Sequence, residues 1–187
     1  MRVTKEQMAE NRRRILDEAS RLFREKGFEA VTVAEVMKAA GLTHGGFYGH
    51  FSSKDDLIAQ AIAHVLAGTT GGGGGLGVYL DAYLSPSHRD DAAGGCPTAG
   101  LAAGIRHQTA AARAAMADGF RSQIERISKA LPAASPAERR CMAIGSWSAM
   151  VGAVIIARAI DDAALSDEVL TQTRAWIDAG IRSMPET

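Results

Sequence analysis

The chain has 187 residues, of which 47% are hydrophobic and 22% are charged, a composition that is ordinary for a soluble globular protein. Its 21 basic and 21 acidic side chains cancel. The zero sum argues against a generally basic nucleic-acid binder, but the placement of charge along the chain matters more. Residues 1–14 carry five basic and two acidic side chains, so the positive excess lies at the N-terminus.

The first predicted helix ends at Gly27. Its apolar residues recur on one face at 3.6 residues per turn: Ile15, Leu16, Ala19, Leu22 and Phe23. A second helix is expected to begin at Thr32, where Thr32 and Glu35 have the spacing of a capping box, and to stop at Gly41. Only two residues then separate it from a third.

The third predicted helix is the short stretch THGGFYGHF, residues 43–51, with Thr43 as its N-cap. Each glycine inside a helix costs about 1 kcal/mol relative to alanine. A helix that enters a DNA groove gains from glycine, because its backbone then comes close to bases and phosphates. Phe47 and Phe51 are expected to anchor it inward, Tyr48 and His50 to donate to phosphates, and His44 to meet base edges. The alternative is a small core helix with two incidental histidines.

A fourth predicted helix runs from Lys54 to Ala67, capped by Ser52 or Ser53 and ended by Gly68. Two short helices joined by a tight glycine-containing turn, with further helices packed on them, form a helix-turn-helix. This motif spans about residues 32–51 of a DNA-binding domain at 1–68.

Residues 11–62 resemble the DNA-binding domain of TetR-type bacterial transcriptional regulators. The likeness lies in the ILxxAxxLF run of the first helix, GF at 27–28, TxxEVxxxAG at 32–41 and FYxHFxxKxxL at 47–57. The resemblance implies that the second helix abuts the DNA backbone through its opening residues Val33 and Ala34. It implies base contacts from His44, Gly45 and Gly46, and phosphate contacts from Thr32, Val33, Thr43, Tyr48, His50 and Lys54. Gly49 stands where many relatives carry a larger side chain, which shifts direct readout onto His44 and onto DNA shape.

The segment 69–75 is glycine-rich and is expected to be a flexible joint, since a phosphate-binding loop needs a lysine and a preceding strand. Beyond it, residues 76–187 are predicted to form an all-helical ligand-binding and dimerisation domain. We expect helices at 78–84 and 116–131, a strong helix start at Ser135-Pro136-Ala137-Glu138, and a last helix that starts at Ser166.

The uncharged run from Cys141 to Ala157 is 17 residues long, at the lower limit of roughly 17–25 residues for a membrane span. It is diluted by glycine and serine, so a buried helix is expected instead, and no membrane partner. Its small residues allow another helix to approach closely. The last two helices therefore predict a symmetric homodimer, as the resemblance also implies. The interface residues named are Trp147, Met150, Val151, Val154, Val169, Thr173, Trp176 and Ile177. The alternative is that the apolar helix only fills the monomer core.

Cys96 lies in a segment, residues 83–104, that resembles a GC or GCP element found in one branch of the same family. It directly precedes Pro97 at an expected helix start, a place that favours a reactive thiolate. Two interpretations stay open: a thiol that senses oxidants or electrophiles, and a small residue that fills a helix cap. Cys141 is expected to be packed inside its helix. Neither cysteine has CxxC spacing and no secretory leader is evident, so a cytoplasmic, nucleoid-associated protein is expected.

The histidines show no metal-ligand spacing, and no nucleophile elbow or paired acidic motif is present, so we expect no metal, no cofactor and no enzymatic activity. The fold class predicted is all-α. The function predicted is that of a dimeric regulator, most simply a repressor, that binds a near-palindromic operator in double-stranded DNA and responds to an unknown small-molecule inducer. The alternatives are an activator with the same DNA contacts, and a small-molecule-binding or enzymatic helical domain whose helix-turn-helix is vestigial.

Overall fold

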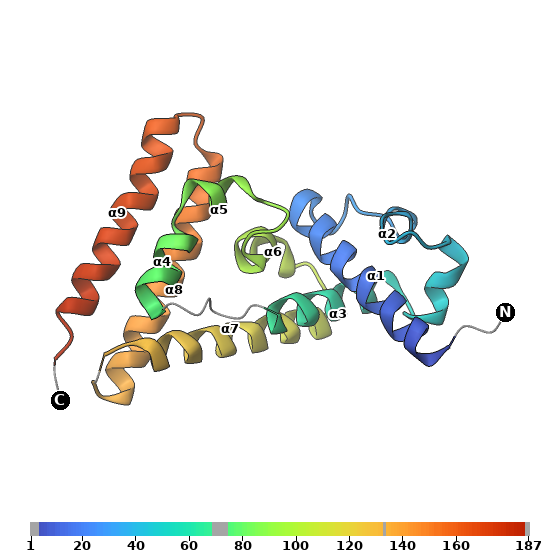
Figure 1. The fold of residues 1–187 in the computed structure, drawn as a ribbon, viewed down its shortest axis with the longest axis horizontal. Helices are drawn as coiled ribbons and strands as arrows, with labels where there is room; N and C mark the ends of the chain where they lie inside the picture. The colour runs from blue at the N-terminus through green and yellow to red at the C-terminus, as the bar shows by residue number, and fades with distance from the viewer. Residues whose placement is uncertain (1–3, 69–74, 133, 186–187) are drawn as a thin grey trace. The chain divides into compact units, whose positions relative to one another are not determined.

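The computed structural model describes residues 4–68, 75–132 and 134–185, and within these ranges the chain is helical, with no strand (Figure 1). The predicted all-α class is confirmed. The helices are α1 Lys5–Lys26, α2 Val33–Ala39, the 3-10 helix η1 His44–Gly49, α3 Lys54–Ala67, α4 Gly75–Tyr83, α5 Pro86–Asp90, α6 Pro97–Ile105, α7 Ala110–Ala130, α8 Pro136–Ala159 and α9 Ala163–Arg182.

The chain divides into two compact units, and the division differs from the predicted domains in one respect. The first unit is Met1–Thr69 together with Gly100–Gly119, and the second is Thr70–Ala99 with Phe120–Thr187. Residues 100–119 were expected with the C-terminal domain. A contact that ties them to the first unit is the hydrogen bond from Gln108 Nε2 to Glu29 Oε1, at 3.2 Å. The predicted flexible joint at 69–75 falls almost wholly outside the described residues, and Gly75 itself opens α4.

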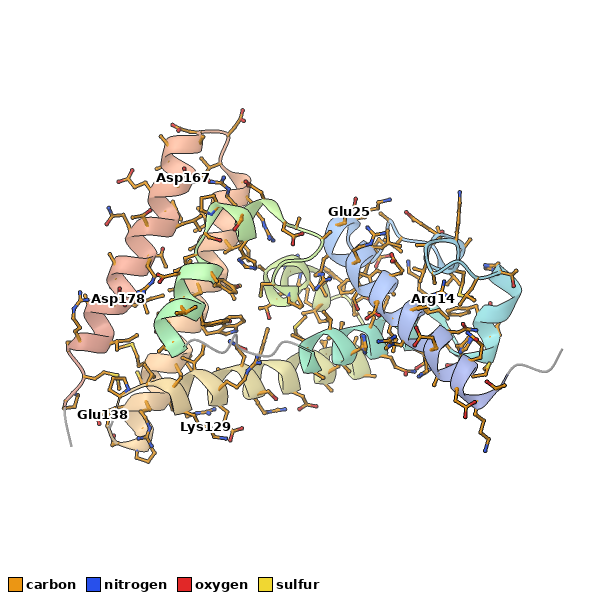
Figure 2. All side chains as sticks on the ribbon, viewed as in Figure 1. Arg14, Glu25, Lys129, Glu138, Asp167 and Asp178 are labelled. Atoms are coloured by element: carbon orange, nitrogen blue, oxygen red, sulfur yellow. The ribbon has the colours of Figure 1, made fainter. Side chains whose placement is uncertain are left out.

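The first unit is built on α1, which packs along α3 and against α2. The predicted apolar face of α1 is buried, and Gly27 ends the helix with a φ of +80°, a conformation that favours glycine. Gly41, with a φ of +68°, makes the turn after α2. Arg14, labelled in Figure 2, donates from Nη2 to the carbonyl of Ala40 and so holds this turn against α1.

The second unit has one core, to which α4, α7, α8 and α9 each contribute buried side chains. Helices α8 and α9 run side by side (Figure 1). The predicted start of α8 is confirmed: Ser135 and Glu138 form a reciprocal capping box, with Pro136 at the first helical position. By length and composition alone α8 is also long and apolar enough to cross a membrane, and 39% of its apolar window is buried in the unit.

Several local expectations need correction. Helix α7 begins at Ala110, six residues before the predicted start. The last helix starts three residues earlier than predicted, because Asp162 caps it and Ser166 is instead buried, its hydroxyl donating to the carbonyl of Ala157 at 2.8 Å. The short helix α5 was not predicted; Ser85 caps it and proline follows. Cys141, expected to be packed, is exposed, because it lies on the outer side of the first turns of α8.

Candidate nucleic-acid interface

The predicted reading element is present as η1, a 3-10 helix rather than an α-helix. Thr43 adopts the extended backbone of an N-cap but makes no side-chain capping bond, so that part of the expectation is wrong. Phe47 and Phe51 are 1% and 2% exposed, and their rings stack with centroids 5.7 Å apart. The two rings hold η1 from behind, as predicted. Thr43, His44 and Tyr48 are left on the outer surface, and His50 is half-buried.

The outer surface of η1 carries the residues expected to meet bases. His44, Gly45 and Gly46 are exposed, and so is Gly49. A Cβ atom added at Gly45 or Gly49 would have no heavy atom within 4 Å, and at Gly46 it would make only ordinary contacts, 3.7 Å from Met37 at the nearest. None of these glycines has a positive φ. The folded protein therefore gives no internal reason for glycine at these positions.

The residues expected to contact phosphates differ in how freely they are presented. Tyr48 is 73% exposed, and Thr32 and Thr43 are exposed. The Thr32 side chain is partly engaged, since its oxygen accepts from the Glu35 backbone N–H at 3.2 Å. The Glu35 carboxylate pairs with Lys26 at 2.6 Å. The pKa of this carboxyl is lowered chiefly by Lys26, and the Thr32 backbone N–H also contributes, as the reciprocal half of the predicted capping box requires.

Val33, His50 and Lys54 are half-buried. Burial lowers the pKa of His50, and the neighbouring Arg12 guanidinium lowers it further. The folded protein therefore favours the neutral form of the His50 imidazole, which has one ring N–H to donate. Lys54 opens α3, and its Nζ lies 3.5 Å from the carbonyl of Glu29.

Two arginines that sequence reasoning counted only as N-terminal charge have structural roles. Arg12 donates from Nη1 to the carbonyl of His50 and from Nη2 to Oε1 of Gln60, and its guanidinium carbon lies 4.4 Å from the centre of the Phe51 ring. It thus joins α1 to the end of η1 and to α3. Arg14 joins α1 to the turn before η1. Both arginines lie off the apolar face of α1, where a side chain can bond within the protein or contact DNA. The sequence pattern does not distinguish these two roles.

The second predicted site is Cys96, which precedes α6 as expected and is 7% exposed. Its backbone N–H donates to Nε2 of His88 at 2.9 Å, and Nδ1 of His88 lies 2.7 Å from the carbonyl of Tyr83. Because a carbonyl only accepts, Nδ1 carries the proton and Nε2 is the acceptor, so His88 is neutral in this arrangement. Burial is the main cause that lowers the pKa of His88.

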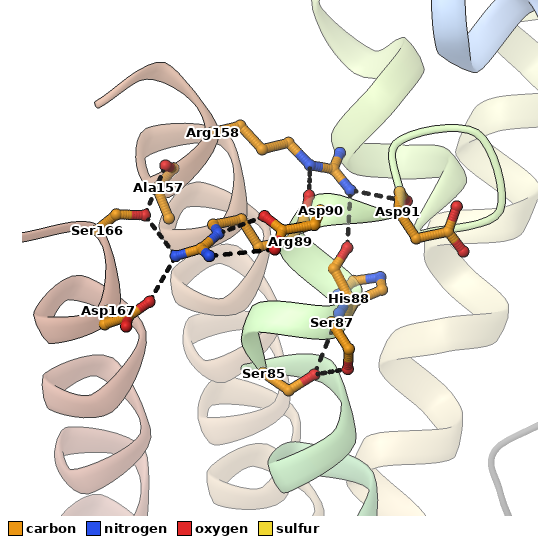
Figure 3. A network of polar contacts seen from close by, with 10 residues as sticks. All are labelled: Ser85, Ser87, His88, Arg89, Asp90, Asp91, Ala157, Arg158, Ser166 and Asp167. Atoms are coloured by element: carbon orange, nitrogen blue, oxygen red, sulfur yellow. Dashed lines mark hydrogen bonds and ion pairs between the residues drawn. The ribbon is translucent and has the colours of Figure 1, made fainter. Parts of the chain in front are cut away.

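Figure 3 shows how the segment around His88 is held. The Arg158 guanidinium donates to three backbone carbonyls, those of His88, Arg89 and Asp91. Arg89 in turn bonds to Ser166 at 2.9 Å and to Asp167 at 2.5 Å, at the start of α9. This network fixes α5 to α8 and α9, and with it the backbone that leads to Cys96.

The predicted dimer residues divide into two groups. Trp147, Met150, Val154 and Ile177 are at most 7% exposed and belong to the core of the second unit, so they leave no surface for a partner. That part of the expectation is corrected: the most apolar face of α8 covers its own core. Val151, Val169 and Thr173 are half-buried, and Trp176 is 62% exposed.

The outward face of α8 forms a stripe that sequence reasoning did not separate from the inner one. It comprises Ile144, Gly145, Ser148, Val151, Gly152 and Ile155, at helical spacings of three and four. Ile144 and Ile155 are each 41% exposed, and nothing lies within 4 Å of a Cβ added at Gly145 or Gly152. We call this set the α8 stripe.

Helix η1 is exposed, rich in glycine, packed inward through two phenyl rings, and follows α2 after a tight turn. This arrangement is that of a helix-turn-helix DNA-binding domain. Residues 15–61 match the family model described as bacterial regulatory proteins, tetR family. The resemblance stated from the sequence is confirmed for this segment.

Curated relatives match mainly over the same region. The HTH-type transcriptional regulator AcrR of Shigella flexneri is 44% identical over 59 residues, which are 32% of this chain and 27% of that protein. The HTH-type transcriptional repressor Rv1474c of Mycobacterium tuberculosis is 33% identical over 92 residues, 48% of this chain and 49% of that protein. The chain thus spans about half or less of the length of these relatives.

Solved structures match over nearly the whole chain. The reduced form of Escherichia coli NemR has a TM-score of 0.71 at 22% identity, with 90% of this chain and 96% of that chain covered. A TetR-family transcriptional regulator from Cytophaga hutchinsonii has a TM-score of 0.72 at 20% identity, with 96% and 98% covered. The two-part helical fold is therefore one that TetR-family proteins share.

Proposed function

We propose that the protein is a dimeric, sequence-selective DNA-binding regulator, without enzymatic activity, that acts in the cytoplasm as a repressor. The observation that carries the proposal is the surface of η1. Gly45 and Gly49 have neither a positive φ nor a neighbour that excludes a side chain. Their absence of side chains is explained by something outside the protein that must approach the backbone closely, and a duplex groove is such an object.

In this proposal His44 contacts base edges from the first turn of η1, and Gly45 and Gly46 let the backbone approach them. Tyr48 and Lys54 contact phosphates, with Thr32, Val33, Thr43 and His50 around them. Phosphate contacts fix the position of the domain, whereas base contacts specify the sequence. With so few side chains on η1, discrimination depends on His44 and on DNA shape.

The proposed dimer joins the α8 stripe and the outer side of α9, including Trp176, to the same surfaces of a second copy. A two-fold dimer presents two reading helices to successive major grooves about 34–36 Å apart, so the operator is a near-palindrome. The support is the exposed apolar area on two adjacent helices, which a monomer would leave in water.

The regulatory part of the proposal is a two-state equilibrium in which a small molecule, or modification of Cys96, favours a conformation that does not match the operator. The effector needs only a few kcal/mol of preference for that state. The neutral His88 and the Arg158 network hold the Cys96 backbone in one position. Loss of an electrophile's effect in Cys96→Ser is the expected result, and normal derepression in that variant leaves Cys96 a packing role only.

The test is a gel-shift titration against the intergenic DNA beside the protein's own gene, at two salt concentrations. Tyr48→Phe and Lys54→Ala should weaken binding to all sequences by similar factors, whereas His44→Ala should reduce discrimination between operator variants. A lack of any sequence-selective, salt-dependent shift would overturn the proposal in favour of a vestigial helix-turn-helix. A transcription assay with the same DNA separates repression from activation.

A further inference from the structure

The second unit contains a pocket of about 150 Å³ between α4 and the C-terminal half of α7. It is lined by Gly75, Leu76, Tyr79, Gln123, Arg126, Ile127 and Ala130. A cavity of this volume in a protein interior is known to hold one benzene ring. Because four of the seven lining residues are apolar, the pocket suits a small, mainly apolar molecule rather than a hydrated ion.

The polar side of the pocket is a row of three side chains. Arg126 donates from Nη2 to Oε1 of Gln123, and Gln123 donates from Nε2 to the hydroxyl of Tyr79 at 2.8 Å. Gln123 is 6% exposed, so the row is held in place by packing. The amide of Gln123 is thereby oriented, and the Tyr79 hydroxyl still has its own proton to donate.

Arg126 contributes the feature that calls for a ligand. Its Nε is buried and, among the described residues, has no hydrogen-bond partner. A buried N–H of a guanidinium without an acceptor is unfavourable, since the group loses water and gains nothing in return. A carboxylate is the acceptor that fits this group best, because its two oxygens match two adjacent N–H groups of a guanidinium.

We propose that this pocket binds a small organic carboxylate whose apolar body is about the size of one six-membered ring. On binding, the Arg126 side chain turns so that Nε–H and a neighbouring Nη–H face the pocket and donate to the carboxylate. The body of the ligand lies against Leu76, Ile127 and Ala130. The site deepens the proposed function by naming the chemical class of the effector, and it rests on that function only for the effect on DNA.

Tyr79 connects the pocket to the core of the second unit through ring contacts. The Tyr79 and Tyr83 rings have centroids 6.0 Å apart, and Tyr83 lies edge-on to Trp147 at 5.4 Å. Gln123 and Tyr79 also join α7 to α4 directly. A ligand that bonds to Arg126 therefore changes contacts on both helices. The change is passed to Trp147 on α8 through the rings of Tyr79 and Tyr83.

The experiment measures binding of benzoate to the full-length protein by isothermal titration calorimetry without DNA, with benzyl alcohol as the neutral probe of similar size. Arg126→Met keeps an unbranched apolar stem, although a shorter side chain, and removes the guanidinium. It should weaken benzoate about ten- to a hundred-fold while it leaves benzyl alcohol unchanged. Arg182→Met, an exposed arginine on α9, is the matched control. Ala130→Leu fills the pocket and should abolish binding of both probes.

Failure of benzoate to bind, or equal binding by wild type and Arg126→Met, would overturn the carboxylate site. Equal binding by Ala130→Leu would overturn the pocket as its location, even if Arg126→Met failed to fold. Gel shifts with benzoate test the link to regulation separately. Arg126-dependent binding without any change in DNA affinity upholds the site and counts against the proposed regulatory function alone.

Discussion

Four glycines in and beside the helix-turn-helix form two pairs that differ in their physical reason. Gly27 and Gly41 have φ angles of +80° and +68°, which other residues adopt only with strain. Gly45 and Gly49 have no such angle, and a side chain at either would project into open space. The first pair serves the fold, whereas the second pair serves whatever approaches η1.

This difference predicts opposite effects from the same substitution. Gly45→Ala and Gly49→Ala should leave the free energy of unfolding unchanged or raise it by up to about 1 kcal/mol, because alanine loses less backbone entropy on folding. Both should weaken operator binding, because a methyl group enters the space that the groove fills. Chemical denaturation and gel shifts on the same samples make the comparison.

Gly27→Ala is the contrasting variant, since it forces alanine into a left-handed conformation and should lower stability by about 1 kcal/mol or more. If Gly45→Ala and Gly49→Ala bound the operator as tightly as the wild type, close approach at these positions would be refuted.

Arg12 illustrates a basic residue that acts within the protein. It bonds to the His50 carbonyl and to Gln60 and lies over the Phe51 ring. Arg12→Met should therefore lower the free energy of unfolding by about 2–3 kcal/mol, since hydrogen bonds to charged groups contribute about 1.5–3 kcal/mol.

Arg13→Met is the matched control for Arg12. Arg13 is exposed on the same helix and pairs with Glu10 at 2.8 Å, and a surface pair of this kind contributes about 0–1 kcal/mol. Urea denaturation of both variants measures the difference. Equal destabilisation of the two would show that the internal bonds of Arg12 contribute nothing particular.

At the scale of elements, the sequence predicted best where a helix start is encoded in neighbouring residues. Ser53 before α3 and Ser135 with Glu138 before α8 cap their helices as expected. The starts of α5 and α9 were missed or misplaced, because capping-type residues are present at several nearby positions. At α9 both Asp162 and Ser166 could serve as the N-cap. Ser166 is buried and its hydroxyl donates to the Ala157 carbonyl, so Asp162 caps the helix.

The stability of the protein should depend on pH through His88, which lies in the segment between α4 and α6. Burial, together with Arg158, lowers the pKa of this side chain, while its bond to Tyr83 and the Asp91 charge oppose the shift. The unfolded chain then binds a proton at a higher pH than the folded protein. His88 therefore contributes stability that is complete above its ordinary pKa of about 6.5 and is lost as pH falls below it.

His88→Gln should reduce this pH dependence, because a neutral amide does not titrate. Thermal unfolding of both proteins between pH 5 and pH 8 gives the measurement. His44→Gln, at an exposed position, should leave the dependence close to that of the wild type. A steeper loss of stability in His88→Gln on acidification would contradict this account.

At the scale of the whole molecule, the sequence indicated two functional parts but not which apolar residues face inward. Periodicity places Trp147 and Val151 on overlapping faces of α8, and only packing against the other helices separates the buried Trp147 from the half-buried Val151. The pocket between α4 and α7 was missed for a similar reason. Tyr79, Gln123 and Arg126 come from helices far apart in the chain, and no local motif links them.

The α8 stripe and Trp176 carry the prediction on assembly. Ile155→Glu and Trp176→Glu should each raise the dimer dissociation constant at least about ten-fold, because a carboxylate is then desolvated in an apolar contact. Analytical ultracentrifugation measures the change. Operator affinity should fall with it, since a monomer engages one half-site only.

Val78→Glu is the control, because Val78 is 57% exposed on α4, outside the proposed interface. Dimers that persist in both Ile155→Glu and Trp176→Glu would move the interface elsewhere on the second unit.

The empty space around Gly45 and Gly49 has a consequence for how DNA specificity can diverge between related proteins. Since neither position is constrained by backbone angle or by a neighbour, changes there leave the folding equilibrium almost untouched while they alter what the groove meets. One or two substitutions at these positions can therefore change the operator that the protein recognises without unfolding it. Saturation mutagenesis of these two sites, selected against randomised operators, is a direct route to retargeted variants.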